Sequence, residues 1–360
     1  MKAMAKQSGL TLVELLIAST LGLILLLGVV QLFVSSSDSF RMAESIGRMQ
    51  ESGRLAQDVL GRAIRNADYW GCIQGAEVSS VLDDGDSDYD PDKHAFVSPV
   101  SVEFDVADGS GDLVTGSDMI TLRGVSSLGI SLADGGQVPE SSANVDVTST
   151  DGLRVGDILL MSDCDQGVVF QVTHMPGSKK IQHNTGNGEP GNKKSGGSWQ
   201  CPGGGGGSNC FPKSFESGDF FKVHVSKYFI EEDAGTGRRA LMMDSLDSGK
   251  LEIVSDVQDI QMQVGVGVSG NNVINSWLDV TAGNLTTINS SYVKAVRISL
   301  LVRSPEDRVA RQRQRVCFPA WTDCSSSANL WEPADANDRH YYRVYTSTYS
   351  IRNRLLNTGT

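Results

Sequence analysis

The strongest feature of the hydrophobic pattern is an apolar run near the start of the chain. From Leu10 to Val34 there are 25 residues with one formal charge, Glu14, and the run is preceded by Lys2 and Lys6. An apolar run of 18 or more residues predicts a helix that can span a membrane. It is too long for the apolar core of a cleaved secretory signal. We therefore expect a membrane-spanning helix over residues 10–34.

The helical pattern continues into a polar segment, residues 35–67. Small and apolar residues recur there at steps of three or four, which is the helical period, and charged residues fill the other faces. The recurring positions are Ala43, Ile46, Met49, Gly53, Ala56, Leu60, Ala63 and Ala67. We expect one helix over residues 10–67 whose second, amphipathic half is covered by the rest of the chain.

The remaining residues, 68–360, predict a β-rich body. Runs rich in Val and Ile alternate apolar with polar positions and are separated by turn residues, as in antiparallel sheets. Residues 175–213 are rich in Gly, Ser, Asn and Lys and predict a flexible insertion. The expected fold class is α+β, with a long N-terminal helix packed on an antiparallel sheet that carries loop insertions.

Glu14 is the anomaly of the apolar run. A carboxylate in hydrocarbon costs about 2.5–3.5 kcal/mol on insertion scales, so it is expected to have a partner. Cleavage between Gly9 and Leu10 would create a suitable one, a free terminal amine. Residues 9–14, Gly-Leu-Thr-Leu-Val-Glu, resemble the processing site of type IV prepilins. One departure is that the residue after the glycine is most often Phe in that family, and here it is Leu10.

The resemblance implies a defined processing pathway. A prepilin peptidase would remove the leader, residues 1–9, and methylate the amine of Leu10. Glu14 would then neutralise the terminus of a neighbouring subunit during fibre assembly. Further stretches resemble the PilW family of minor pilins: residues 62–72, 293–304 and 342–354. Residues 80–215 resemble no family that we can name.

A minor pilin of this family would prime a type IV pilus and lie at or near its tip. The implied partners are the prepilin peptidase, other minor pilins, the major pilin, the inner-membrane assembly platform and a PilY-type tip adhesin. The subunit would cross the inner membrane once, with a periplasmic body, and would enter the extracellular fibre after assembly. Lys2 and Lys6 on the cytoplasmic side agree with the positive-inside rule. Adhesion, twitching motility or DNA uptake would follow from the fibre.

Two alternatives stay open. A minor pseudopilin of type II secretion, of the GspJ kind, shares the same N-terminus. A membrane-anchored periplasmic enzyme or binding module could use residues 80–215, and a pocket with convergent polar groups would favour it. The sequence has no HExxH or GxSxG motif and gives no argument for a triad assembled from distant residues, so we expect no enzyme.

The six cysteines are expected to form disulfides, because an exported body lies in an oxidising compartment. They are Cys72, Cys164, Cys201, Cys210, Cys317 and Cys324. Closeness in sequence favours the pairs Cys201–Cys210 and Cys317–Cys324 among fifteen connectivities, which leaves Cys72–Cys164.

The net charge limits the partners that the chain can bind. The formal net charge is −12, which makes direct binding to nucleic acid unfavourable.

Acids alternate at Asp84, Asp86, Asp88 and Asp90 and could supply oxygen ligands to Ca²⁺. The EF-hand glycine and bidentate glutamate are missing, so a solvated acidic loop is favoured over calcium, and no other cofactor is expected. A basic run, Arg308 to Arg315, predicts either a solvated connector or a docking site for an acidic neighbour.

Overall fold

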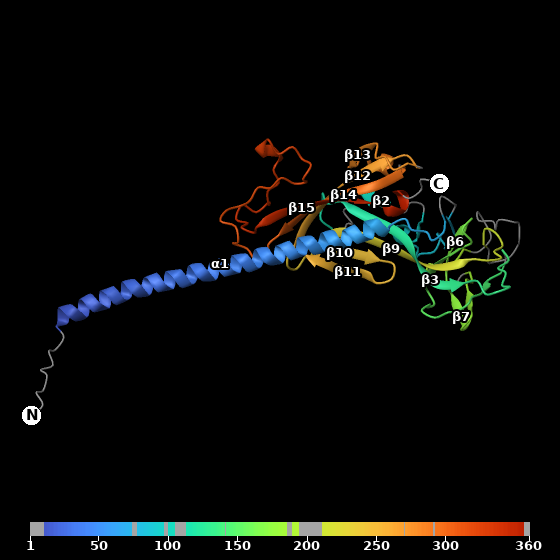
Figure 1. The fold of residues 1–360 in the computed structure, drawn as a ribbon, viewed down its shortest axis with the longest axis horizontal. Helices are drawn as coiled ribbons and strands as arrows, with labels where there is room; N and C mark the ends of the chain where they lie inside the picture. Colours follow the sequence, from blue (N-terminus) through green and yellow to red (C-terminus); the bar gives the residue numbers. More distant parts are fainter. Residues whose placement is uncertain are drawn as a thin grey trace, which may run out of the picture.

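A computed structural model describes most of the chain, and Figure 1 shows its course. The described residues are 11–73, 78–96, 100–104, 113–140, 142–185, 189–193, 211–269, 271–290 and 292–355. They form one long helix, α1, which projects from a β-rich body of three sheets. This is the α+β class expected from the sequence.

Helix α1 spans Leu12–Asn66, 55 residues, in agreement with the single helix expected over 10–67. Thr11 is its N-cap and forms a capping box with Glu14, which satisfies backbone N–H groups that have no partner within a helix. At 1.5 Å per residue the helix is about 80 Å long. Every residue from Thr11 to Glu44 is exposed, so the body covers only the second half.

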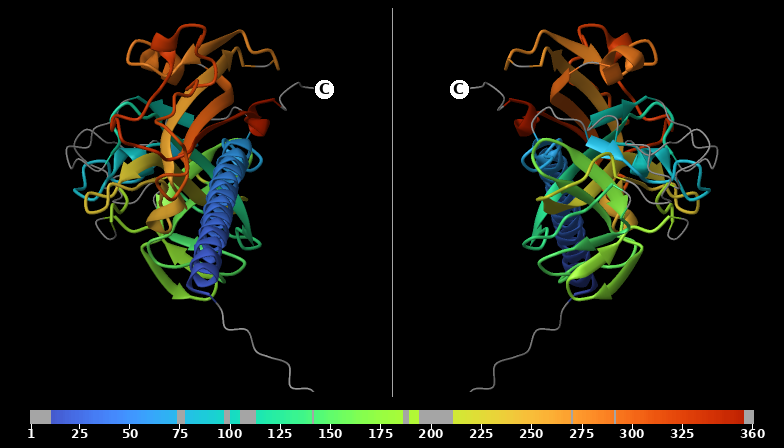
Figure 2. Two further views of the ribbon diagram at one scale, coloured as in Figure 1. Left: turned by 90° about the vertical axis from the view of Figure 1, so that its left-hand side faces the viewer. Right: turned by 90° about the vertical axis from the view of Figure 1, so that its right-hand side faces the viewer.

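The body-facing stripe of α1 is made of small and apolar residues. Its buried members are Ser45, Met49, Gly53, Ala56, Leu60, Gly61 and Ile64. Ala43 is exposed, so the stripe predicted from the sequence begins too early. The body starts to cover α1 only at Ser45. The stripe packs on the last strands of the chain, and Figure 2 looks nearly along α1 with the strands lying mostly to one side of it.

The sheet against which α1 packs has four antiparallel strands in the order β13-β12-β14-β15. Their bounds are β12 (Val257–Gly267), β13 (Ser276–Asp279), β14 (Tyr292–Arg303) and β15 (Tyr342–Ser350). Strand β14 is the most buried because it lies between β12 and β15 with α1 across its face. Strand-like runs at residues 257–266, 293–303 and 340–352 predict β12, β14 and β15 to within two residues, whereas no such run predicts β13.

A second sheet has eight strands, with the path β1-β6-β5-β9-β10-β11 and with β3 joining β2 to β9. Their bounds are β1 (Val78–Ser80), β2 (Val100–Glu103), β3 (Met119–Ser131), β5 (Ile158–Ser162), β6 (Gly167–Gln171), β9 (Asp219–Glu232), β10 (Arg239–Ser245) and β11 (Gly249–Ser255). All described pairs are antiparallel except β1 with β6. Strands β3 and β9 are long and run from the region under α1 into the far part of the body.

Short elements complete the described fold. A third sheet has the order β4-β8-β7, with β4 (Asn144–Asp146), β7 (His174–Gly177) and β8 (Lys180–Gln182). The short helices are α2 (Pro91–His94), α3 (Leu285–Ser290), the 3-10 helix η1 (Ser327–Asn329) and α4 (Arg352–Leu355). Strands β7 and β8 lie inside the stretch predicted as a flexible insertion, so that prediction is wrong for its first residues.

The body has separate hydrophobic cores. The largest joins the α1 stripe to residues of both large sheets, including Leu60, Ile120 and Leu300. Another is formed between residues 81 and 220 and includes Phe170 and Phe211, which lies near the end of the predicted insertion. The part of the chain between α1 and β9 therefore builds its own core beside the helix-covered one.

Glycine at position 61 is a packing requirement. A Cβ there would lie 2.5 Å from the ring of Tyr349 on β15, whose hydroxyl donates to the carbonyl of Gln57 at 2.8 Å.

We predict that Gly61→Ala displaces this ring and destabilises the protein by about 1–3 kcal/mol. Thermal unfolding of the purified protein in detergent measures the effect. Gly47→Ala on the same helix is the control, since nothing lies within 4 Å and the better helix former should stabilise by about 1 kcal/mol. Equal shifts in both variants would contradict the packing role.

A buried carboxyl gives the body a pH dependence. Asp118 is 1% exposed and accepts the N–H of Met262 at 2.6 Å through Oδ2. Burial raises the pKa of Asp118 to about 8, with a further contribution from nearby Asp259. The folded state therefore keeps a proton that the unfolded chain releases, so stability falls as pH rises from about 4 to about 8.

We predict that Asp118→Asn raises the melting temperature at pH 8 and changes it little near pH 4, because the amide stays neutral and its oxygen still accepts the N–H of Met262. Melting curves across this range measure the effect, with the exposed Asp151→Asn as control. A pH slope that is the same in wild type and Asp118→Asn would refute the assignment.

Candidate functional site

The exposed half of α1 is the first part of the candidate site. Large apolar side chains from Leu12 to Phe40 are exposed all around the helix; Leu25 is 72% exposed. Among the described residues, α1 is the one helix long and apolar enough to cross a membrane. A continuous apolar surface of this size requires lipid or other apolar helices around it.

Glu14 lies at the tip of this surface. Its Oε2 accepts the backbone N–H of Thr11 at 3.1 Å and the Thr11 hydroxyl at 3.0 Å, while the Thr11 hydroxyl oxygen accepts the N–H of Glu14 at 3.3 Å. In the described part of the chain no cationic group pairs with this carboxylate. Gly9 and Leu10 lie outside the described residues, so cleavage and methylation there stay predictions.

The second part is the junction where α1 meets the body. Ser45, which is 1% exposed, donates its hydroxyl hydrogen to Glu306 Oε2 at 2.6 Å. Arg48 extends the contact, with its guanidinium 3.9 Å from Glu306 Oε1 and 2.7 Å from Glu44. These bonds attach the segment after β14 to the helix at the first buried turn. The sequence analysis did not identify Ser45 or Glu306 as contact residues, although a serine within an apolar stripe was a signal.

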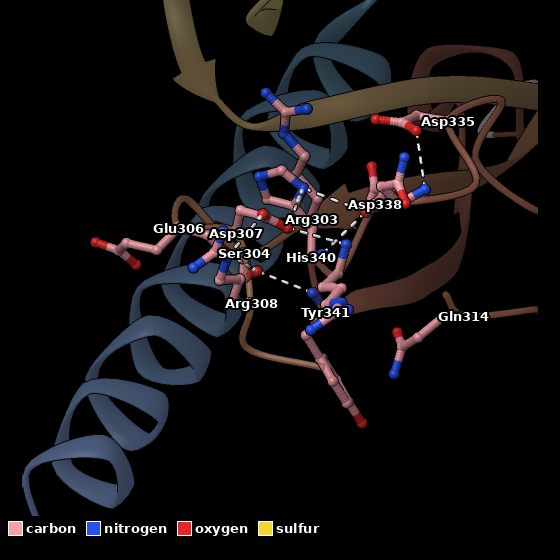
Figure 3. Close-up of polar contacts among 12 residues, drawn as sticks. Arg303, Ser304, Glu306, Asp307, Arg308, Gln314, Asp335, Asp338, His340 and Tyr341 are labelled. Atoms are coloured by element: carbon pink, nitrogen blue, oxygen red, sulfur yellow. Dashed lines mark hydrogen bonds and ion pairs between the residues drawn. The ribbon is translucent and has the colours of Figure 1, made fainter. Parts of the chain in front are cut away.

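Behind Glu306, three side chains tie two connecting loops together, as Figure 3 shows. His340 Nδ1 lies 3.2 Å from Asp338 Oδ1 and 3.8 Å from Asp307 Oδ1. Backbone N–H groups of Arg339 and His340 donate to Asp307 and Asp338, both at 2.9 Å. Burial alone would raise the pKa of Asp307, but backbone N–H bonds outweigh it and lower that pKa. The carboxylates of Asp307 and Asp338 thus accept hydrogen bonds from backbone N–H groups. The cluster attaches the loop that contacts α1 to the segment before β15.

The basic run lies on this same loop but is divided. Arg313 and Arg315 pair with Glu332, at 3.4 Å and 2.9 Å. Arg308 and Arg311 instead line a groove of about 770 Å³ against α1 residues from Gln31 to Met42. Docking of this run onto an acidic neighbour stays a prediction.

The carboxylates of the acidic loop bond to nearby backbone and side-chain groups of the protein. Asp86 and Asp90 each accept a backbone N–H two residues ahead, both at 2.9 Å. Asp84 pairs with Lys193 at 2.8 Å. Among the described residues, Asp84, Asp86, Asp88 and Asp90 are not gathered into one group of ligands. Calcium binding there stays a prediction, and the turns favour the solvated-loop interpretation.

Two disulfides lie among the described residues, and both are pairs expected from the sequence. Cys72 is joined to Cys164 and Cys317 to Cys324. The first fastens the segment after α1 to the β5–β6 turn, 92 positions along the chain. Cys201 and Cys210 lie outside the described residues, so their pairing stays a prediction.

Comparison with known proteins gives matches at both ends of the chain. The family model of the type IV pilus-assembly protein W matches residues 227–353, which run from β9 to α4. The prokaryotic N-terminal methylation motif matches residues 4–30. No curated protein matches significantly. Residues 80–215 lie outside both matches.

One similar solved structure is the type IV-like pilin TTHA1219 from Thermus thermophilus, at 16% identity and a TM-score of 0.21. The similarity covers 37% of this chain, which spans 66% of the length of that pilin. The two family matches, one on the N-terminal half of α1 and one on the sheet that covers its other half, support the identification of this chain as a minor pilin of the PilW type.

Proposed function

We propose that this protein primes assembly of a type IV pilus and is incorporated at or near the fibre tip. The proposal rests on the two halves of α1. The first half is apolar and fully exposed, and the second half packs against the body. Lipid can cover the apolar half before assembly, and the corresponding helices of other subunits can cover it afterwards. A body attached at one end of such a helix then remains on the outside of the helical bundle.

In this proposal the peptidase removes residues 1–9 and methylates Leu10, and the helix holds the subunit in the inner membrane. Glu14 then compensates a terminal ammonium, its own or that of a neighbour. The capping box leaves the carboxylate at the first turn of α1, and the proposal requires the amine created by cleavage, on the same chain or on an adjacent helix, to pair with it there. Pairing of one charge per subunit would set the register between helices, because apolar surfaces alone slide easily.

The proposed partners follow from the same pathway. They are the prepilin peptidase, the major and other minor pilins, the inner-membrane assembly platform and a PilY-type adhesin. Adhesion, twitching motility or DNA uptake would be properties of the completed fibre. The net charge of −12 supports an indirect role in any DNA uptake.

We predict that Glu14→Ala is processed normally but fails to enter fibres. The unpaired ammonium among apolar helices would cost about 3–5 kcal/mol, enough to exclude the variant in competition with other subunits. Immunoblots of membrane and sheared-fibre fractions measure this. The control is Glu44→Ala, which removes an exposed carboxylate paired with Arg48 on the same helix and should enter fibres normally. Normal incorporation of Glu14→Ala would refute the pairing role.

A deletion separates the pilus from type II secretion, which uses subunits with the same N-terminus. We predict that deleting the gene removes surface pili and leaves exoprotein export unchanged, as measured by electron microscopy of cells and assay of culture supernatants. Loss of export with normal piliation would instead assign the chain to a pseudopilus.

A further inference from the structure

Ser126, His224 and Asp247 form a hydrogen-bonded chain that the pilin proposal does not use. Ser126 and His224 lie outside both family matches, and Asp247 lies within the match over residues 227–353. The Ser126 hydroxyl lies 2.6 Å from His224 Nε2, and His224 Nδ1 lies 3.1 Å from Asp247 Oδ2. Serine, imidazole and carboxylate in this order are the arrangement of a nucleophile, its base and the group that orients the base. Their separations in sequence, 98 and 23 residues, hide the arrangement from any local motif.

Neighbouring strands hold the three groups in place. Ser126 is on β3 and His224 is on β9, and the register pairs Gly124 with His224, so the two side chains are diagonal neighbours across the ladder. Asp247 lies in the turn between β10 and β11, which the N–H of Leu246 attaches to the carbonyl of Val225 at 3.0 Å. Groups mounted on paired strands keep their mutual geometry better than groups on free loops.

The hydrogen-bond pattern also selects the tautomer that a base requires. A carboxylate can only accept, so Nδ1 carries the hydrogen toward Asp247 and Nε2 is left to accept the hydrogen of Ser126. Lys222 binds the other oxygen of Asp247 at 2.8 Å and fixes the carboxylate from its far side. Lys222 is in turn 3.3 Å from Asp157.

Ser126 and His224 line a groove of about 680 Å³ between the end of α1 and β3. Its apolar lining includes Ala63, Leu122 and Tyr228, which suits a short acyl chain. Arg65 and Arg352 line the same groove and give it a positive potential. Positive charge in such a groove favours an oxyanion of the kind that forms when a carbonyl is attacked.

We propose that Ser126, His224 and Asp247 form an acyl-transfer site for short-chain carboxylic esters. Ser126 Oγ attacks the ester carbonyl carbon while its proton passes to His224 Nε2. The carbon–oxygen bond to the leaving alcohol then breaks, and the alcohol takes that proton. Water attacks the acylated serine with loss of a proton to Nε2, and the acid departs as Ser126 recovers the proton. Asp247 positions the imidazole throughout.

The test is covalent labelling of the full-length protein in detergent with a fluorophosphonate, followed by intact mass and peptide mapping. Attack by Ser126 forms the oxygen–phosphorus bond, expels fluoride and passes the proton to His224. We expect one label, on Ser126, and its loss in Ser126→Ala. His224→Asn should slow labelling at least 100-fold, the usual size of general-base assistance. Asp247→Asn should also slow it, and p-nitrophenyl butyrate hydrolysis should fall in parallel.

A matched serine provides the control. Ser131 is on the same strand, is partly exposed and donates to Asp219 Oδ1 at 2.6 Å, and no histidine among the described residues is bonded to it. Ser131→Ala should label like wild type. Wild-type protein that labels no faster than Ser126→Ala, or a label on another residue, would overturn the proposal and leave the three groups as a surface hydrogen-bond network. Fibre assembly is not part of the readout, so this result is independent of the pilin proposal.

Discussion

The burial of one stripe of α1 against the last sheet is the interaction on which the rest of the structure depends. It is a close contact: Gly53 and Gly61 allow the rings of Tyr345 and Tyr349 to lie directly against the helix backbone. Because the stripe begins only at Ser45, the body holds the helix by its second half and leaves about 50 Å of exposed helix projecting, of which the first ~35 Å is apolar. The contact between helix and sheet thus determines where the body lies relative to the membrane or fibre.

The connecting loop after β14 secures the point at which the helix leaves the body. Glu306 binds Ser45, and the Asp307–Asp338–His340 cluster attaches the same loop to the segment before β15. Any force along α1 is therefore passed to β14 and to its edge neighbour β15, which pair continuously from Ala295 with Ser350 to Arg303 with Tyr342. Under the proposed function, this geometry would keep the body attached while the subunit is pulled out of the membrane.

The region between α1 and β9 adds a second unit to the pilin core. It has its own hydrophobic cores and a disulfide that ties it to the segment after α1. The two long strands β3 and β9 join it to the core under α1, to which they contribute Ile120 and Ile230. Both family matches leave this region out. The Ser126–His224–Asp247 chain lies where the two units meet, which is where binding sites commonly occur.

Local periodicity predicted the elements whose residues repeat over many positions. The steps of three and four from Ile46 to Ala67 predicted the second half of α1, because burial of one helix face repeats at that spacing. The Val-rich run at 293–303 predicted β14, because burial imposes a different pattern on a strand. The same reasoning extended the stripe to Ala43, since periodicity does not say where the body ends. Strands β7, β8 and β13 have only three or four residues each, too few for a repeating pattern to predict them. The bond between Ser45 and Glu306 and the alignment of Ser126 with His224 depend on strand register and packing, which no local pattern records.

The central claim is that this chain is processed and assembled as a pilin, and the most direct test is its intact mass. The protein would be extracted from membranes of cells with and without the prepilin peptidase. The account predicts a peptidase-dependent mass equal to residues 10–360 plus one methyl group. An unchanged mass in both strains would contradict it, and would make α1 a plain membrane anchor for the β-rich body.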